Sequence, residues 1–211
     1  MADLQVLERI EPVDRTRVHV DDPFAALVLA GDLYWRLRRA GMRGDHSCVL
    51  LCIGTDRSTG DSLGPLVGWK MSQLRQSFFT VYGTLEEPVH AANLEEKLAE
   101  IQRAHPGKVV IAVDASLGGI DNVGFISVGN GALEPGAGVR KKLPLVGDVH
   151  ITGVVNVGGY MEYIVLQNTR LSTVMRMAGV IVEALKRVAH EMGRHHLGSE
   201  RHDVRGEKPE V

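Results

Sequence analysis

The sequence predicts an α/β protein in which a mostly parallel sheet is covered by helices on both faces. Apolar runs of strand length alternate with segments whose apolar residues recur at helical spacing, as in strand-helix-strand units. The run "KVVIAVDA" is apolar on both faces of a strand, as in the centre of a parallel sheet. With 211 residues and 44% hydrophobic residues, the chain has the size and composition of one compact domain.

The first half of the chain is expected to contain two helices and two strands. Residues 1–20 show no sustained period and predict an arm or an edge strand. Residues 21–41 read as a helix that Asp21 or Asp22 caps and Gly41 ends. The apolar run 48–53 predicts a core strand, followed by a helix over 62–76 and a strand over 79–84. The residues expected to be largely buried on the first helix are Phe24, Leu27, Val28, Tyr34, Trp35 and Leu37.

The second half continues the alternation. Asn93, with Glu96 three residues later, predicts a capping-box start for a helix over 94–105. Strands are expected over 108–115, 122–130 and 151–157, and Gln167-Asn168-Thr169 is expected to cap a last helix over 171–191. Residues 1–193 are therefore expected to form a single domain, and the polar residues 194–211 a flexible tail.

Composition limits the partners and the location. A formal net charge of −2 gives no support for nucleic-acid binding. The absence of an 18-residue apolar run and the polar, acidic N-terminus argue against a membrane span and a secretory signal, so a cytoplasmic protein is expected. Cys48 and Cys52 are four residues apart in one predicted strand, too far to bridge, and are expected to be core residues in a reducing compartment.

The stretch "IGTDRSTGDSLGPLVG" is a glycine-rich turn between a predicted strand and a predicted helix. Such turns often hold phosphate on backbone N–H groups. Here five residues separate Gly54 from Gly60, where the phosphate-loop pattern needs four. Asp61-Ser62 also replaces the lysine and hydroxyl residue of that pattern. An anionic ligand is therefore disfavoured.

Two acids follow predicted strands. Asp61 lies in the turn after residues 48–53, and Asp114 ends the strand that includes Val109 to Val113. Functional groups collect at the carboxyl ends of parallel strands, and two carboxylates that meet there share one proton, which provides an acid and a base. The alternatives are structural: Asp61 as a helix N-cap, and Asp114 as a loop cap or Asx turn.

The joint pattern is more specific. "TGDSLGP" followed by "VVIAVDAS" resembles the two aspartate motifs of the bacterial spore germination protease. Residues 24–188 are similar to the YyaC-type sporulation proteins in the blocks "IGTDRSTGDSLGP", "VDASLGG", "PGAGV", "ITGVVNVGG" and "VLQNTRLSTVMRMA". The resemblance implies a three-layer α/β/α sandwich, also found in hydrogenase-maturation endopeptidases, located in the forespore or mother-cell cytoplasm. It also implies aspartate-dependent hydrolysis of a protein or peptide substrate, with Asp61 and Asp114 as catalytic residues.

The maturation endopeptidases use a histidine and two acids to bind nickel or a substitute cation, and "DVHITG" places His150 at an equivalent position. This resemblance implies a divalent cation, nickel or zinc, held by Asp61, Asp114 and His150. The germination protease works without that ligand set, so no cofactor is required. The alternative for His150 is a surface or hydrogen-bonded residue.

Other residues complete the predicted site. Asp56, Ser62 and Asn156 are candidates for substrate binding. The run 140–142, Arg-Lys-Lys, is either a solvated loop face or a basic loop that orients a peptide.

The apolar helices over 24–37 and 171–185 suggest a homo-oligomer. Two functions follow: an aspartate-dependent peptidase, or a non-catalytic regulator or binding module with the same fold, which the fold alone does not distinguish.

Overall fold

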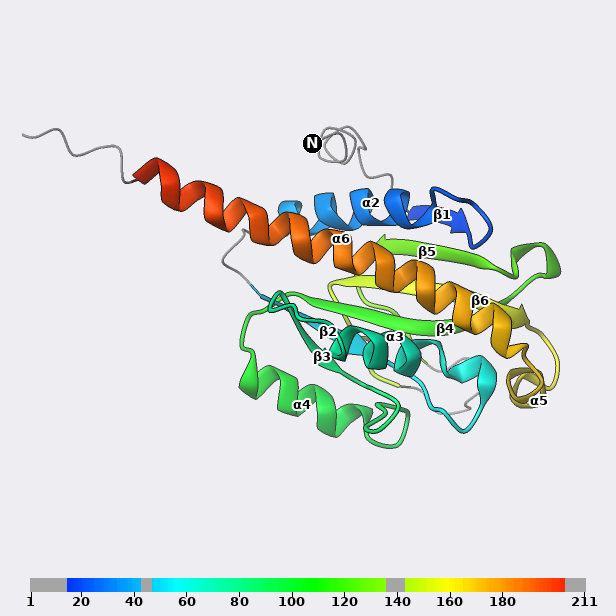
Figure 1. Cartoon of the computed structure of the whole chain (residues 1–211). Helices are drawn as coiled ribbons and strands as arrows, with labels where there is room; N and C mark the ends of the chain where they lie inside the picture. Colours follow the sequence, from blue (N-terminus) through cyan, green and yellow to red (C-terminus); the bar gives the residue numbers. More distant parts are fainter. Residues whose placement is uncertain (1–14, 43–46, 136–142, 204–211) are drawn as a thin grey trace, which may run out of the picture.

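The computed structural model describes residues 15–42, 47–135 and 143–203 of the chain. Within them, a six-stranded sheet lies between two layers, so the predicted three-layer α/β/α fold is confirmed (Figure 1). The strands are β1 (Arg15–His19), β2 (Cys48–Cys52), β3 (Phe79–Tyr82), β4 (Val110–Gly118), β5 (Phe125–Asn130) and β6 (Val149–Val157). The helices are α2 (Ala25–Arg39), η1 (Thr59–Asp61), α3 (Leu63–Ser72), α4 (Leu94–Ala104), η2 (Ile120–Asn122), α5 (Glu162–Gln167) and α6 (Leu171–Asp203).

The strand order is β1-β5-β6-β4-β2-β3. The four strands from β6 to β3 are parallel, whereas β5 runs antiparallel to both β6 and β1. Arg15–His19 therefore forms the edge strand that the sequence left open as one alternative, and residues 1–14 lie outside the described part. The parallel half of the sheet aligns the carboxyl ends of β2, β4 and β6 at one edge.

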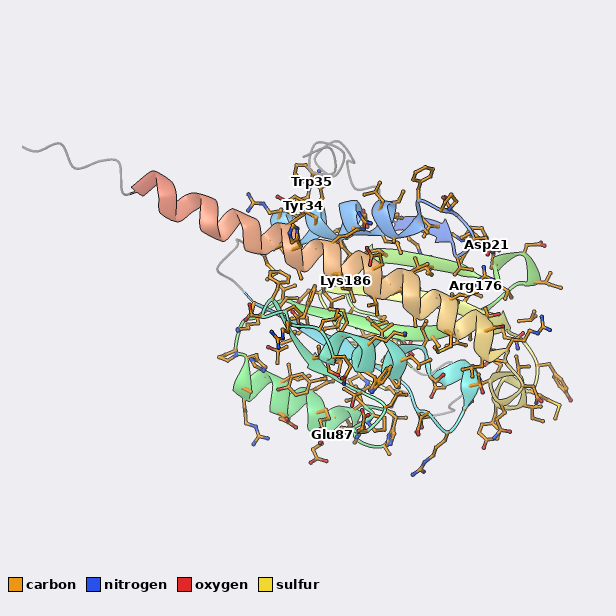
Figure 2. The ribbon with its side chains drawn as sticks, viewed as in Figure 1. Asp21, Tyr34, Trp35, Glu87, Arg176 and Lys186 are labelled. Atoms are coloured by element: carbon orange, nitrogen blue, oxygen red, sulfur yellow. The ribbon has the colours of Figure 1, made fainter. Side chains whose placement is uncertain are left out.

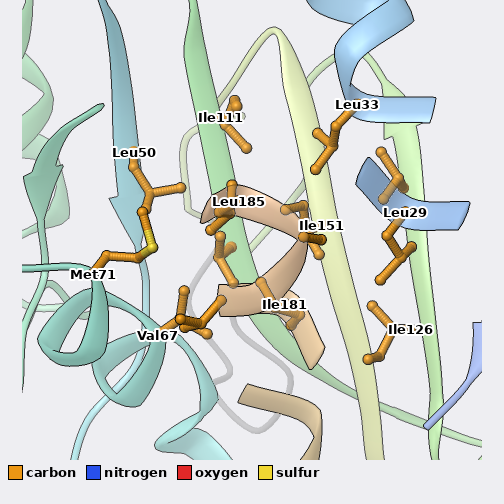
Figure 3. Close-up of a cluster of buried hydrophobic side chains, with 14 of the residues drawn as sticks. Leu29, Leu33, Leu50, Val67, Met71, Ile111, Ile126, Ile151, Ile181 and Leu185 are labelled. Carbon is orange, nitrogen blue, oxygen red and sulfur yellow. The ribbon is translucent and has the colours of Figure 1, made fainter. Parts of the chain in front are cut away.

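One face of the sheet is covered by α2, α3 and α6, which lie side by side across it (Figure 1). Their apolar side chains interlock with the central strands in one buried cluster (Figure 3). The cluster includes Leu29 and Leu33 of α2, Val67 and Met71 of α3, Ile181 and Leu185 of α6, and Leu50, Ile111, Ile126 and Ile151 of the sheet. Most of the apolar side chains of α2 and α6 are thus covered within the chain. Leu171 and Met175 of α6 remain exposed, and the homo-oligomer stays a prediction.

An ion pair also links α6 to the segment before α2. Arg176 of α6 forms an ion pair with Asp21, which precedes α2, and both side chains are more than half exposed (Figure 2). An exposed pair of this kind contributes little to stability, about 0 to 1 kcal/mol. The packing of α2 on α6 therefore depends on the buried apolar contacts.

The second face carries a smaller cluster. Leu94 and Ile101 of α4 pack against Val49, Leu51 and Ala112 of the sheet. The connection between β5 and β6 adds Leu133, Leu143 and Val146 to this cluster. Residues 140–142, the basic run, lie outside the described part of the chain.

Two elements are longer than the sequence predicts. Strand β4 continues past the expected end at Ala115 to Gly118, because β6 still pairs with it across a β-bulge between Ser116 and Leu117. Helix α6 continues past the expected end near residue 191 to Asp203. Extending a formed helix adds one hydrogen bond for each residue fixed, so polar residues continue it without an apolar period to mark them. Residues 204–211 of the predicted tail lie outside the described part.

Two local predictions are wrong. Phe24 is 64% exposed, because it precedes the first turn of α2, where Asp22 accepts its backbone N–H. Asn93 does not cap α4 with its side chain. Its amide instead accepts the N–H of His90 at 2.8 Å and donates to the carbonyl of Pro88 at 3.0 Å, which shapes the turn before the helix.

Helix α3 lies directly against the backbone of the residues that follow β2 and β3. A Cβ atom at Gly64 would lie 2.1 Å from the carbonyl oxygen of Ile53, and one at Gly68 would lie 1.9 Å from the carbonyl oxygen of Gly83. Only hydrogen fits at these positions, so the glycines set the distance between α3 and the sheet.

We expect Gly64→Ala to destabilise the protein by about 3 kcal/mol, because backbone cannot move aside as a flexible side chain can. Gly179→Ala is the matched control: Gly179 lies in α6, and its added Cβ would meet no atom within 4 Å. That control should stabilise the protein by about 0.5 to 1 kcal/mol. Urea unfolding measures both, and equal midpoints for Gly64→Ala and the unmodified chain would contradict the close approach.

Candidate functional site

Asp114 lies where β4 loses one of its neighbours. The last residue of β2, Cys52, pairs with Val113, and the N–H of Ile53 donates to the Val113 carbonyl at 2.8 Å. On its other side Asp114 still pairs with Thr152 of β6. Asp114 is therefore inside β4 rather than at its end, but it is the first residue of β4 beyond the reach of β2. Its side chain is only 5% exposed, and its Oδ1 accepts the N–H of Ala115 at 2.8 Å.

The glycine-rich turn returns to the end of β2 and brings Asp61 there. Gly54 has a φ of 136°, which side-chain-bearing residues rarely adopt, and a Cβ at Gly54 would lie 2.0 Å from the Asp61 carbonyl oxygen. That carbonyl accepts the N–H of Thr55 at 3.0 Å, which closes the turn. Helix η1, whose last residue is Asp61, also packs against β4. Both predicted acids thus lie at the same edge of the sheet.

Burial changes the acidity of Asp61. Loss of solvent around its carboxylate raises the pKa from 3.8 to about 6, and a hydrogen bond from the backbone of Thr55 opposes this rise. The positive N-terminal end of a helix lowers the proton affinity of a carboxylate beside it, and α3 begins two residues after Asp61. The net change is in the other direction, because desolvation is the larger effect. A carboxyl group with a pKa near 6 can both donate and accept a proton near neutral pH.

The structural alternative for Asp61 fails in detail. Ser62, not Asp61, is the residue before α3, and no side chain caps that helix. The Ser62 hydroxyl is directed back into the turn, where it donates to the Thr59 carbonyl at 2.7 Å. Ser62 is buried and stabilises the turn, whereas Asp56 is exposed at its outer side. Of these two predicted substrate-binding residues, only Asp56 has an accessible side chain.

Asn156 of β6 holds the segment that packs against η1. Its amide donates to the carbonyl of Val165 at 3.3 Å and to the hydroxyl of Thr169 at 3.2 Å. These contacts hold α5 and the start of α6 against η1, where a Cβ at Gly60 would lie 2.7 Å from Leu166. Asn156, predicted to bind substrate, is committed to these structural hydrogen bonds.

Helix α5, which packs against η1, was not predicted from the sequence. Thr169 was expected to cap the last helix, yet its hydroxyl donates back to Val165 at 2.9 Å. The apolar residues of "YMEYIVLQ" were the available signal for a short helix. Met161 is the residue before that helix and has a φ of 51°, in the left-handed region. Residue type does not predict such a start, because residues other than glycine, asparagine and aspartate rarely adopt this conformation.

His150 is turned away from the acids. It lies on β6 between Gly129 of β5 and Ala112 of β4. Its ring is over β5: a Cβ at Gly129 would lie 2.7 Å from Nε2, and Nδ1 is 2.9 Å from the Gly131 carbonyl oxygen. This position matches the hydrogen-bonded alternative for His150. Asp114 is on the opposite side of β6 from β5.

No group of three or more His, Cys, Asp and Glu side chains within the described ranges is arranged to hold a metal ion. The structure therefore does not bring Asp61, Asp114 and His150 together as a ligand set. Binding of nickel or zinc by these residues stays a prediction from the family resemblance.

The two cysteines are core residues, as expected. Both are unbridged and fully buried in β2. Burial raises the pKa of the Cys48 thiol to about 12 and that of Cys52 further still, so neither is a thiolate nucleophile near neutral pH. Among the described helices, none combines the length and apolar character needed to cross a membrane.

These features define an α/β/α protein with two buried or half-buried carboxylates at the carboxyl edge of its sheet. The chain belongs to the family described as "Protein of unknown function (DUF1256)", which it matches over residues 17–184. It is 60% identical to "Uncharacterized protein YyaC" of Bacillus subtilis (strain 168) over 137 residues, 65% of this chain and 67% of that protein. The predicted YyaC-type family is thus confirmed.

A solved structure is also similar to the chain. It is the crystal structure of a [NiFe] hydrogenase maturation protease, HycI, from Thermococcus kodakarensis KOD1. The TM-score is 0.44 at 18% identity, over 66% of this chain and 92% of that one. A similarity of this size supports no conclusion about activity.

The raised pKa of Asp61 predicts how stability changes with pH. Because the folded state disfavours the ionised carboxylate, Asp61 lowers stability progressively as the pH rises from about 4 to about 6, by about 3 kcal/mol in total. Asp61→Asn should therefore be more stable than the unmodified chain near pH 7.5, above this window, and equal to it near pH 4, at its lower limit. Urea unfolding at both pH values measures the difference.

Asp56→Asn is the matched control for this prediction, because Asp56 lies in the same turn and is exposed. It should change stability little at either pH. A loss of stability in Asp61→Asn near neutral pH would show that the ionised carboxylate is stabilised by the fold, contrary to the burial argument.

Proposed function

We propose that the chain is an aspartate-dependent peptidase of sporulating cells, acting on a protein or peptide substrate in the cytoplasm through Asp61 and Asp114. The observation that carries this proposal is the pKa of Asp61, raised by burial to about 6, at the sheet edge that also holds the buried carboxyl group of Asp114. Perturbed acids are concentrated at functional sites. The resemblance of "TGDSLGP" and "VVIAVDAS" to the germination-protease motifs supplies the reaction class and the cellular setting.

In this proposal the two acids divide the proton transfers. One carboxylate takes a proton from water as the water oxygen attacks the carbonyl carbon of the scissile peptide bond. The other, protonated, polarises the carbonyl oxygen or gives its proton to the leaving amine. The C–N bond then breaks, and the products are a carboxylic acid and an amine. Asp61 suits the proton-transfer role, because its pKa is close to neutral pH.

A second candidate is a non-catalytic regulator or binding module. It is favoured by one observation: the causes that raise and lower the pKa of Asp61 are burial and the Thr55 backbone, not a second carboxylate. If Asp61 and Asp114 do not share a proton, they do not form the acid-base pair that peptide hydrolysis needs. The two acids are then compatible with a non-catalytic protein that has the same fold. Cleavage assays on variants distinguish the two functions.

We predict that Asp114→Asn lowers hydrolysis by at least about a hundred-fold, because one of the two proton carriers is lost. The substitution is close in shape, so the circular dichroism spectrum should not change. The substrates are an acid-soluble spore protein extract and a random peptide library, with cleavage followed by mass spectrometry.

Asp121→Asn, at an exposed acid in η2, is the control and should retain full activity. Full activity in Asp114→Asn would exclude the two-carboxylate mechanism. Absence of cleavage of both substrate sets by the unmodified chain would favour the binding module.

A further inference from the structure

Five apolar side chains are exposed along the segment that leads from β6 into α5. They belong to Val157, Tyr160, Met161, Tyr163 and Ile164, and we name them the α5 platform. Tyr160 is 83% exposed and Tyr163 is 63% exposed. A contiguous group of large apolar side chains with two tyrosines is unusual for solvent-facing surface and typical of binding surfaces.

The platform is fixed by hydrogen bonds around it. The N–H of Gly158 donates to the carbonyl of Gly118 at 2.8 Å, which ties the segment to the end of β4. The N–H of Gly159 donates to Oε1 of Glu162 at 3.2 Å, and Asn156 donates to Val165 within α5. The exposed side chains therefore project from a held backbone. A surface of this kind loses little conformational entropy when a ligand binds.

The platform is also close to Asp61. Leu166, on the buried side of α5, and Thr169, two residues after the helix, lie against Gly60, the residue before Asp61. A helix with its side chains is about 10 to 12 Å across, so the exposed side of α5 is within reach of the turn against which its buried side packs. A substrate segment of three to four extended residues, about 10 to 14 Å long, would connect the platform with Asp61.

Size indicates the kind of occupant. At about 200 Å² for each side chain, the two tyrosines expose on the order of 300 Å², and the three smaller residues add less than that again. The platform is therefore no larger than about 600 Å², whereas each partner of a stable protein interface contributes about 800 Å². It is too small for a stable interface with a second copy but adequate for a few side chains of a peptide.

We propose that the α5 platform is the docking surface for an apolar segment of the substrate, one that contains aromatic or leucine side chains, beside the bond to be cleaved. This inference rests on the proposed peptidase function and adds the class of substrate sequence that the site selects. Tyrosine rings offer apolar faces for such side chains and a hydroxyl that stays in water.

Binding is measured separately from cleavage in the full-length Asp114→Asn chain. The probe is a fluorescein-labelled ten-residue peptide with phenylalanine and leucine at its centre, compared with a peptide that has serine at both positions, by fluorescence anisotropy. The apolar peptide should bind at least about ten-fold more tightly, which corresponds to about 1.4 kcal/mol. Tyr160→Ser combined with Tyr163→Ser should remove this preference.

Phe24→Ser is the matched control, because Phe24 is an equally exposed aromatic residue at the start of α2. It should leave binding unchanged. Equal binding of the two peptides, or an equal loss in Phe24→Ser, would overturn the inference. So would a dimer in light scattering that Tyr160→Ser converts to a monomer, because a second copy would then cover the platform.

The proposed function can fail separately from this inference. If the platform binds the apolar peptide but the unmodified chain cleaves no substrate, the docking surface stands and the peptidase is excluded. If the chain cleaves but the tyrosine variants keep the same KM, the peptidase stands and the docking surface is excluded.

Discussion

The candidate site depends on a close approach of backbone to backbone at the end of β2. Gly64 places the first turn of α3 against Ile53, and Gly54 places the carbonyl of Asp61 against the chain that leaves the strand. A side chain at either position would push the turn away from the sheet. The same contacts exclude solvent around Asp61, so the packing that positions the acid also raises its pKa. The raised pKa that suits Asp61 to the proposed proton transfer therefore also lowers the stability of the fold near neutral pH.

Helices, strand pairing and side-chain hydrogen bonds hold this edge of the sheet in place. Helices α3 and α6 cover one face with apolar side chains, and β4 extends beyond β2 because β6 continues to pair with it. Asn156 and Thr169 fix α5 against η1, so the glycine-rich turn is held on two sides. Such rigid support is what catalysis by positioned acids needs, because small displacements change proton transfer strongly. The α5 platform extends the same rigid edge to the surface.

Much of this arrangement was predictable from residue patterns. The run from Val109 to Val113 identified the central strand, and the pattern of the glycine-rich turn identified Asp61 as a candidate and argued against a phosphate loop. The continuation of β4 beyond Ala115 was not predictable, because residues 116–118, Ser-Leu-Gly, show no apolar pattern and their pairing with β6 is set by the backbone. The sequence left two alternatives for His150, because the space over Gly129 that accommodates its ring depends on the register between β5 and β6. The cation hypothesis depended on the orientation of this ring.

The central claim is that Asp61 and Asp114 form one proton-handling site. The most direct test is a carbon-13 NMR titration of the Asp61 carboxyl group, in the unmodified chain and in Asp114→Asn. Burial alone raises the midpoint to about 6, and a proton shared with Asp114 raises it further, so a midpoint above about 6 is expected in the unmodified chain. A lower midpoint is expected in the variant, because a neighbouring negative charge is removed. A midpoint near the ordinary value of 3.8, or one that Asp114→Asn leaves unchanged, would contradict a shared site.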